Sequence, residues 1–508
     1  MSTWRSVVTN DSRVIQALVL VLVTSLIILN FCIFFVGFIA SDDGIYVAAA
    51  RAWSSPVNPL PTSHGDFRYP ILWPLAALEH LVAGPPPIAY ALLPLAFSIA
   101  LGIAVVWFVG ANIGGRAALA AALLLSTLPL AVIQSSIINV DVIETLFLFL
   151  SLAWFVAAAR ASTAHRTGWL FFSGLALGGA LLTRETAYGF LIVYGLFWLS
   201  GAWLPRQHYL WVLIGALLVI GPEMGYYVAH GESPLYRFFT IAGSHGTIHL
   251  STADFPSGTG NVSDNRWLAP IAALLLNQEF TLLFYAAALA LAWLRFENSL
   301  TATDGRILRV FLFAAVVYFV WLGYGGAIRP LPRYFLFPAV VAVIPIALLV
   351  QRTRFTGRAM LAVAGLVAAN YLGLAVENIH PRFAANQVAL LADTADQPIV
   401  TDPETASRAR QIASFRRSPN QGLIAVTPPE APPFMVVSIA GDRNPDALPL
   451  TQGAGVPRLI LELQPPKLLI GHLLDLTGLA ALLTPSQYQW LAVRNPRVLV
   501  FQIDAKPQ

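Results

Sequence analysis

The residues best suited to chemistry are carboxylates that stand at the ends of long apolar runs. Asp42 and Asp43 follow the first run directly, where a carboxylate can take a proton from an acceptor hydroxyl or hold a divalent cation. The same pair can also cap the helix that follows, which is a purely structural role. Asp141 and Glu144 begin a later apolar run one helical turn apart, so both face the same side of that helix. An acid at a helix N-terminus also interacts favourably with the helix dipole. This structural role accounts well for one of the two acidic residues, but less well for the presence of both.

Arginines near these carboxylates are candidates for binding phosphate, because a guanidinium offers paired donors to phosphate oxygens. Arg184 and Glu185 lie in a turn between two apolar runs, where an exposed salt bridge is the simpler interpretation. Arg329 and Arg333 lie in the connection GYGGAIRPLPRYFLFP. Two arginines there oppose the distribution of basic residues along the chain, so they indicate an anionic partner.

Composition identifies the class of protein that positions these residues. The chain has 508 residues, 57% hydrophobic and 11% charged, and its mean hydropathy is +0.68. Soluble domains carry roughly 25% charged residues, and disorder requires low hydrophobicity, so a polytopic membrane protein is the class that remains. The net charge of +4 contains no run of five like charges, which argues against a nucleic acid partner. The single cysteine, Cys32, excludes an internal disulfide and a cysteine-based metal site.

Eleven apolar stretches can cross a bilayer core of about 30 Å as helices. They cover roughly residues 15–40, 88–109, 117–136, 142–159, 169–183, 187–204, 209–229, 272–294, 308–327, 334–350 and 359–376. Basic residues are concentrated in alternate connections, and the positive-inside rule then places the N-terminus in the cytoplasm. An odd number of spans places the chain outside from about residue 377. Most carboxylates of the membrane region fall outside or near the outer ends of spans. Acidic groups at membrane depth are costly and usually functional, so several of them on one side suggest a site that faces outward.

Two further parts of the chain differ from the spans. Residues 71–83 are too short and proline-marked for a span and predict a helix in the membrane interface, after a short amphipathic helix over 48–53. Residues 378–508 form a polar, proline-rich tail. Strands are predicted over 398–401, 434–439, 459–463 and 498–503, and helices over 405–415 and 467–476. We therefore expect an all-α polytopic membrane domain over 1–377 and a small α/β extracytoplasmic domain over 378–508.

The motifs and their order along the chain resemble those of the GT-C superfamily of membrane glycosyltransferases. Within this superfamily, the chain resembles the protein mannosyltransferase and aminoarabinose-transferase-like (phospholipid-carrier-dependent) families. The sequence Asp42-Asp43-Gly44-Ile45-Tyr46 is similar to the family's D-E-x-x-Y, and Asp141 to the Asp that begins the fourth span. Leu182-Thr183-Arg184-Glu185-Thr186 resembles L-T-K-E-T, with Arg for Lys. Gly231-Glu232-Ser233-Pro234-Leu235-Tyr236 is similar to G-D/N-P-L-Y, and Arg333-Tyr334 with Phe337-Pro338 to R-Y-x-x-x-P. The resemblance covers roughly residues 15–376.

The resemblance implies transfer of a sugar from a polyprenyl phosphate, such as undecaprenyl phosphate, to a lipid, glycan or protein acceptor. The reaction would take place at the periplasmic face of a bacterial inner membrane. Asp42 would be the catalytic base or would orient the acceptor, while Asp43 and Asp141 would shape the site, with a divalent cation as a candidate cofactor. Arg184, Arg329 and Arg333 would neutralise the phosphate leaving group. The other implied substrate-binding residues are Tyr46, Arg68, Glu144, Glu185 and Tyr334.

One departure weakens the link to the aminoarabinose-transferase branch. That branch has F-E-K-P in the first loop, whereas this chain has Phe67-Arg68-Tyr69-Pro70, so a lipid A acceptor is not implied. An O-antigen-type polymerase or ligase is the alternative, and it would depend on Arg237 and Arg266. A transporter is a third class, which predicts charges at mid-membrane, for which Glu223 and Glu279 are the ambiguous cases.

Overall fold

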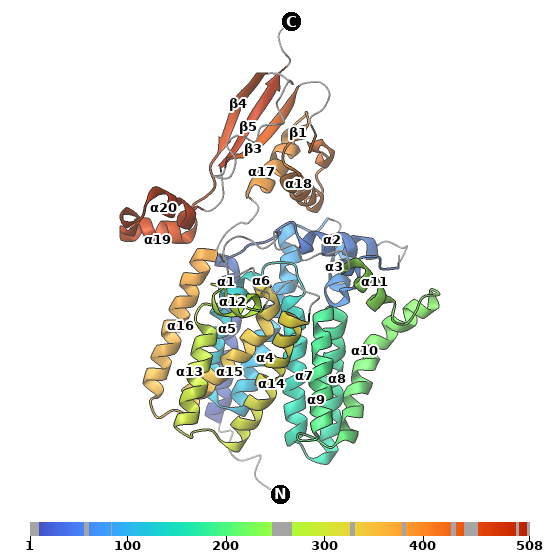
Figure 1. Ribbon diagram of the computed structural model, residues 1–508, viewed down its shortest axis with the longest axis vertical. Coiled ribbons are helices and arrows are strands. Elements are labelled where there is room, and N and C mark those ends of the chain that lie inside the picture. Colours follow the sequence, from blue (N-terminus) through green and yellow to red (C-terminus); the bar gives the residue numbers. More distant parts are fainter. Residues whose placement is uncertain are drawn as a thin grey trace. The chain divides into compact units, whose positions relative to one another are not determined.

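The computed structural model describes residues 10–54, 60–82, 84–245, 267–325, 331–377, 383–427, 433–440, 456–493 and 497–504. The chain divides into two compact units, both drawn in Figure 1. The helical unit contains Met1–Phe35, Ala49–Pro85 and Ala89–Leu374, and the second unit contains Val36–Ala48, Pro86–Ile88 and Ala375–Gln508. The second unit therefore includes a short segment from the beginning of the chain as well as the tail.

Long helices make up the first unit. They are α1 (Asn10–Ile33), α3 (Tyr69–Leu81), α4 (Pro87–Asn112), α5 (Gly115–Thr127), α6 (Pro129–Gln134), α7 (Asp141–Arg160), α8 (Thr163–Thr183), α9 (Tyr188–Ser200), α10 (Tyr209–Ala229), α11 (Tyr236–His245), α12 (Ala269–Leu275), α13 (Leu283–Phe296), α14 (Ala302–Tyr324), α15 (Leu336–Arg352) and α16 (Thr356–Glu377). Helix α2 (Asp42–Trp53) begins in the second unit and ends in the first.

The predicted membrane domain is confirmed as an all-helical one, but the number of eleven spans is not. Within the described ranges, seven helices are long and apolar enough to cross a membrane. They are Val14–Ile33, Pro87–Asn112, Asp141–Arg160, Arg206–Ala229, Ala302–Tyr324, Pro332–Arg352 and Thr356–Val376. The chain is thus an integral membrane protein.

Three predicted spans differ from the observed helices. The first helix ends at Ile33, and the chain continues through Gly37, whose φ of 75° lies in the left-handed region. The stretch 117–136 divides into α5 and α6 at Pro129, which has no amide hydrogen to continue the helix. The stretch 272–294 divides into α12 and α13. Hydropathy alone detects the apolar run but not these interruptions.

Helix α15 is the centre of the helical unit. It packs against α5, α13, α14 and α7, and almost every residue from Leu336 to Leu348 is buried. A helix that is apolar on all sides is stable only when neighbours surround it.

Helices α8 and α10 approach so closely that their contact requires glycine. A Cβ on Gly174 of α8 would lie 2.1 Å from the carbonyl oxygen of Val212, and one on Gly215 of α10 would lie 2.3 Å from that of Phe171. Small residues commonly permit such backbone approach between membrane helices. Since α8 also packs against α7, this contact helps to fix the two helices whose ends carry the candidate site.

The second unit contains a five-stranded sheet with strand order β2-β1-β3-β5-β4. The strands are β1 (Ile399–Val400), β2 (Ile424–Ala425), β3 (Phe434–Ala440), β4 (Val456–Leu463) and β5 (Arg497–Asp504). Strand β1 pairs in parallel with β2 and β3, whereas β5 pairs antiparallel with β3 and β4. The helices are α17 (Phe383–Thr394), α18 (Pro403–Phe415), α19 (Leu469–Thr477) and α20 (Pro485–Ala492).

The prediction of a small α/β domain in the tail is confirmed. Its core contains Val388 of α17, Ile412 of α18, Val437 of β3 and Val500 of β5. The sequence patterns did not reveal β2, α17 or α20.

Replacing Gly215 by Ala should destabilise the protein, because the added methyl group meets the backbone of α8 and forces the two helices apart. Overpacking of this kind costs roughly 1–3 kcal/mol. Thermal unfolding of the purified protein in detergent measures the loss. Gly221→Ala on the same helix is the control, since no atom lies within 4 Å of its added Cβ. Equal melting temperatures for the two variants would contradict the close contact.

Candidate functional site

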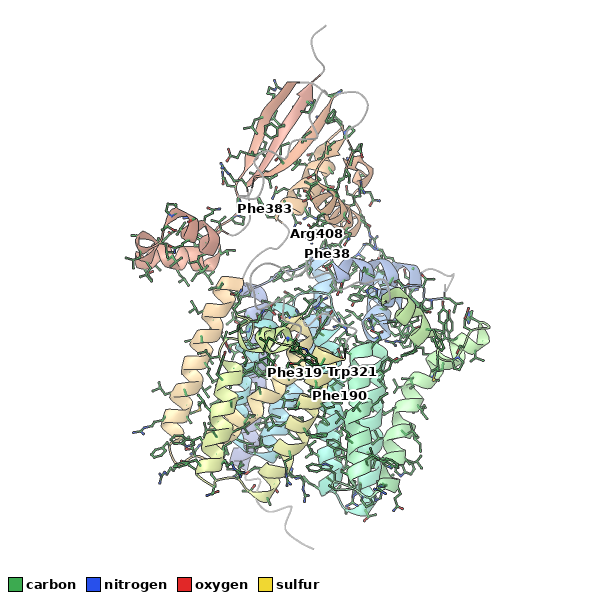
Figure 2. The ribbon with its side chains drawn as sticks, viewed as in Figure 1. Phe38, Phe190, Phe319, Trp321, Phe383 and Arg408 are labelled. Atoms are coloured by element: carbon green, nitrogen blue, oxygen red, sulfur yellow. The ribbon has the colours of Figure 1, made fainter. Side chains whose placement is uncertain are left out.

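The segment with Asp42, Asp43 and Tyr46 folds with the second unit. The ring of Phe38 stacks on that of Phe415 at the end of α18, with centroids 4.0 Å apart and planes inclined by 3°. Ala40 belongs to the same hydrophobic cluster as Val388 and Ile412. Figure 2 labels Phe38 together with Phe383 and Arg408 of this unit. The first candidate motif is therefore held by residues that lie hundreds of positions later in the sequence.

Asp43 organises the turn that precedes α2. Its side chain is only 1% exposed, and its carboxylate accepts hydrogen bonds from the backbone N–H groups of Ser41 (2.7 Å), Ile39 (2.5 Å) and Gly44 (3.0 Å). Burial raises the pKa of Asp43 to about 6, although the three backbone donors oppose the rise. These contacts favour a structural role for Asp43, whereas Asp42 next to it is half-buried.

A second group of candidates lies in the helical unit, where α7 begins and α8 ends. Arg184 Nη1 lies 2.5 Å from Asp141 Oδ1, and both side chains are buried. The Arg184 guanidinium lies 4.0 Å from the ring centroid of Tyr334, and that of Arg333 lies 5.4 Å from the same ring. Tyr334 belongs to a short 3-10 helix (Pro332–Phe335) that leads into α15. The salt bridge between Arg184 and Asp141 is buried, and not the exposed one that the turn alone suggested.

Glu144 lies one turn after Asp141 on α7 and is also buried. It accepts hydrogen bonds from the hydroxyl of Thr186 at 2.5 Å and from that of Tyr318 at 2.8 Å. Tyr318 comes from α14, so Glu144 connects three parts of the helical unit. Figure 2 labels Phe190, whose ring packs edge-on against that of Tyr318. Glu144 thus holds the turn that carries Arg184 and Glu185.

Glu185 is the centre of a neighbouring cluster of charges. It forms an ion pair with Arg68, and Arg237 Nη2 lies 3.5 Å from its Oε1. Burial alone would raise the pKa of Glu185, but Arg68 and Arg237 outweigh burial and lower it to about 2. Arg237 also donates hydrogen bonds to the carbonyl oxygen of Leu182 at 3.3 Å and lies 3.5 Å from Glu223 Oε1. Two buried arginines and two partly buried glutamates are therefore grouped together beside Arg184.

Tyrosines complete this cluster. The hydroxyl of Tyr227 donates to Glu223 Oε1 at 2.5 Å, and the hydroxyls of Tyr69 and Tyr227 lie 3.0 Å apart. Neither tyrosine was predicted as a site residue, and Arg237 and Glu223 were named only for the alternative classes. Tyr69 lies 158 positions from Tyr227, and Arg237 lies 55 positions from Leu182, so no local pattern reveals these contacts.

The structure brings together Asp141, Glu144, Arg184, Glu185 and the more distant Arg68, Arg333 and Tyr334 within the helical unit. Asp42, Asp43 and Tyr46 belong to the second unit. Arg329 lies outside the described residues.

The observed contacts do not fit a divalent cation bound by Asp43 and Asp141. Both oxygens of Asp43 accept backbone hydrogen bonds, and Asp141 is paired with Arg184. In the described part of the chain, no three His, Cys, Asp or Glu side chains are grouped closely enough to hold a metal.

Comparison with known proteins supports the family resemblance. Residues 71–226 match the family model of dolichyl-phosphate-mannose-protein mannosyltransferases. Among curated proteins, no sequence matches significantly.

Solved structures show the same fold. The chain aligns with ArnT from Cupriavidus metallidurans in the apo state with a TM-score of 0.58 and 14% identity, over 97% of this chain and 99% of ArnT. The same enzyme bound to undecaprenyl phosphate gives a TM-score of 0.54 and 15% identity over 96% and 99%. At this level of identity the likeness shows the fold, and it extends over both units of the chain.

Asp43→Asn should remove a pH dependence of stability. The pKa of Asp43 is about 6 in the folded protein against an ordinary 3.8, so folding favours the protonated form. The contribution of protonated Asp43 to the stability of the fold is complete below pH 3.8 and is lost as the pH rises through 6. The melting temperature of the wild type minus that of the variant should therefore fall between pH 5 and 7.5, by the equivalent of about 1 kcal/mol.

Asp393→Asn, which changes an exposed carboxylate of the same unit, is the control for the loss of one negative charge. A pH-independent difference for Asp43→Asn would show that this carboxyl has an ordinary pKa.

Proposed function

We propose that this chain, a membrane protein of the GT-C superfamily with the ArnT-like fold, transfers a sugar from a polyprenyl-phosphate donor to an acceptor hydroxyl. The observation that carries the proposal is the buried Arg184, held between Asp141 and the ring of Tyr334. Arg184 lies within the segment that matches the mannosyltransferase family. ArnT, which has the same fold, binds undecaprenyl phosphate.

The Arg184 arrangement suits a phosphate leaving group. Asp141 on one side and the face of Tyr334 on the other restrict the guanidinium to one orientation, so little conformational entropy is lost when an anion binds. Cation–π contact with Tyr334 stabilises the positive charge without removing hydrogen-bond donors. Arg333, which faces the same ring, adds a second positive charge at this point.

The Glu185 cluster supports Arg184 indirectly. Arg237 donates two hydrogen bonds to the carbonyl oxygen of Leu182 in the last turn of α8, and Glu185 contacts both Arg68 and Arg237. These contacts immobilise the residues on either side of Arg184. The buried pairing gives Arg237 a positioning role here and does not favour the O-antigen-type alternative.

The proposed chemistry is a displacement at the anomeric carbon. The acceptor oxygen forms a bond to this carbon, the bond from the carbon to the phosphate oxygen breaks, and the polyprenyl phosphate leaves with the electron pair. The acceptor proton passes to a carboxylate, for which we propose Asp42 because of its place in the D-E-x-x-Y-like motif. A single displacement of this kind inverts the configuration of the sugar.

We place the reaction at the outer face of the membrane. The basic connections on the opposite side support this orientation through the positive-inside rule. A bacterial inner membrane with a periplasmic C-terminal unit is the setting that this orientation implies. The acceptor class is a lipid, glycan or protein, and mass spectrometry of envelope glycolipids, glycans and proteins from a deletion strain would identify which one loses its sugar.

Asp42→Asn should abolish transfer while the protein remains folded, because the amide cannot accept the proton. General base catalysis contributes about 10²–10⁴-fold, so the rate should fall at least about a hundredfold. Transfer of labelled sugar from the polyprenyl-phosphate donor in membranes is the measurement, and Asp393→Asn is the matched control. A normal rate in the Asp42 variant would refute its assignment as the base.

Arg184→Lys should weaken donor binding, because lysine keeps the charge beside Asp141 but loses the planar, two-pronged donor geometry. Loss of one charge-assisted hydrogen bond raises the donor KM by roughly tenfold or more, with a melting temperature close to that of the wild type. Arg184→Gln should also lower the melting temperature, since it leaves Asp141 buried without its cation. An unchanged donor KM in both variants would exclude Arg184 from the phosphate site.

A further inference from the structure

A cleft between α13 and α14 is separate from the clusters described above. Both helices pack against α15, and the space between them has a volume of about 750 Å³. This is within the range of pockets that hold small molecules, about 300–1,000 Å³. The cleft lies beside the connection from α13 to α14, at the end of the helical unit opposite to α3 and α11 (Figure 1).

The lining of the cleft is apolar along its length and basic at the end near the connection. Leu291, Leu308, Leu312, Phe313 and Val316 supply the apolar wall.

Two arginines form the basic end. Arg295 belongs to the last turn of α13, and Arg309 lies in the second turn of α14. Gly305 also lines the cleft, and no atom lies within 4 Å of a Cβ added to it, so the space in front of it is open.

The nearby carboxylates are engaged with other residues. Asp304 is fully buried, accepts a hydrogen bond from the Thr301 hydroxyl at 2.7 Å and lies 2.9 Å from Arg352 Nε. Glu297 accepts a hydrogen bond from Thr353 and lies 3.8 Å from Arg354 Nε. These acids therefore do not neutralise the basic end of the cleft.

The two arginines at the basic end have no acidic partner of their own. Arg309 donates to the carbonyl oxygen of Gly305 at 3.1 Å and lies 5.7 Å from the ring centroid of Trp203. Within the described ranges, neither Arg295 nor Arg309 forms an ion pair. Two exposed cations next to an apolar, membrane-level wall match an amphiphile with an anionic head and hydrocarbon tails.

We propose that this cleft binds one anionic phospholipid of the bilayer. Its headgroup phosphate contacts Arg295 and Arg309, and an acyl chain lies along Leu312, Phe313 and Val316. Basic pockets between membrane helices attract anionic headgroups through charge, and each arginine near the surface contributes about fivefold in affinity. The bound lipid would fill the space between α13 and α14. The proposal does not depend on sugar transfer.

The test uses the full chain in nanodiscs that contain phosphatidylglycerol and phosphatidylcholine, with native mass spectrometry to count the retained lipids. The wild type should retain phosphatidylglycerol in preference to phosphatidylcholine. The double variant Arg295→Gln/Arg309→Gln should retain it at least about fivefold less well. The control Arg306→Gln/Arg358→Gln removes the same charge from exposed arginines that do not line the cleft, and it should behave like the wild type.

Gly305→Leu is the second variant, because it fills the cleft and leaves both arginines in place. It should also reduce retention of phosphatidylglycerol.

Four results would overturn the proposal. They are unchanged retention in both cleft variants, equal loss in the control, equal retention of the two phospholipids by the wild type, or displacement of phosphatidylglycerol by a polyprenyl phosphate at equal concentration.

Discussion

A charge buried in an apolar helix bundle must have a partner. The pair of Arg184 and Asp141 shows how this constraint determines the arrangement of the polar residues in the helical unit. An ion removed from water without compensation costs several kcal/mol even after relaxation. Asp141 is 3% exposed and Arg184 is 9% exposed, so each depends on the other. Asp141 begins α7 and Arg184 directly follows α8. The pair therefore joins the start of α7 to the end of α8.

The same constraint explains why the polar residues form clusters. Glu144 has two hydroxyl donors, Glu185 has two arginines, and Glu223 has Arg237 and Tyr227. Each of these acids has at least one partner from a different helix or turn. An arrangement of this kind is rigid, and rigid positioning of charge is what stabilisation of a charged transition state requires.

The segment that precedes α2 gives the second unit a structural connection to the motif that contains Asp42 and Asp43. Phe38 and Ala40 pack on α17 and α18, and Asp43 closes the turn with three backbone hydrogen bonds. The tail is therefore more than an appended domain, because it supports the segment on which Asp42 lies.

The sequence by itself determined the class of the protein, the approximate helices and the α/β character of the tail, because these depend on local hydropathy and periodicity. It also predicted one site that joins Asp42 and Asp43 to Asp141, Glu144, Arg184, Glu185 and Arg333, and this shared site stays a prediction. Only the tertiary structure decided which partners these residues have. Tyr318 binds Glu144 from 174 positions away, and Arg68 pairs with Glu185 across 117 positions. Contacts of that range depend on how helices pack, which local patterns do not encode.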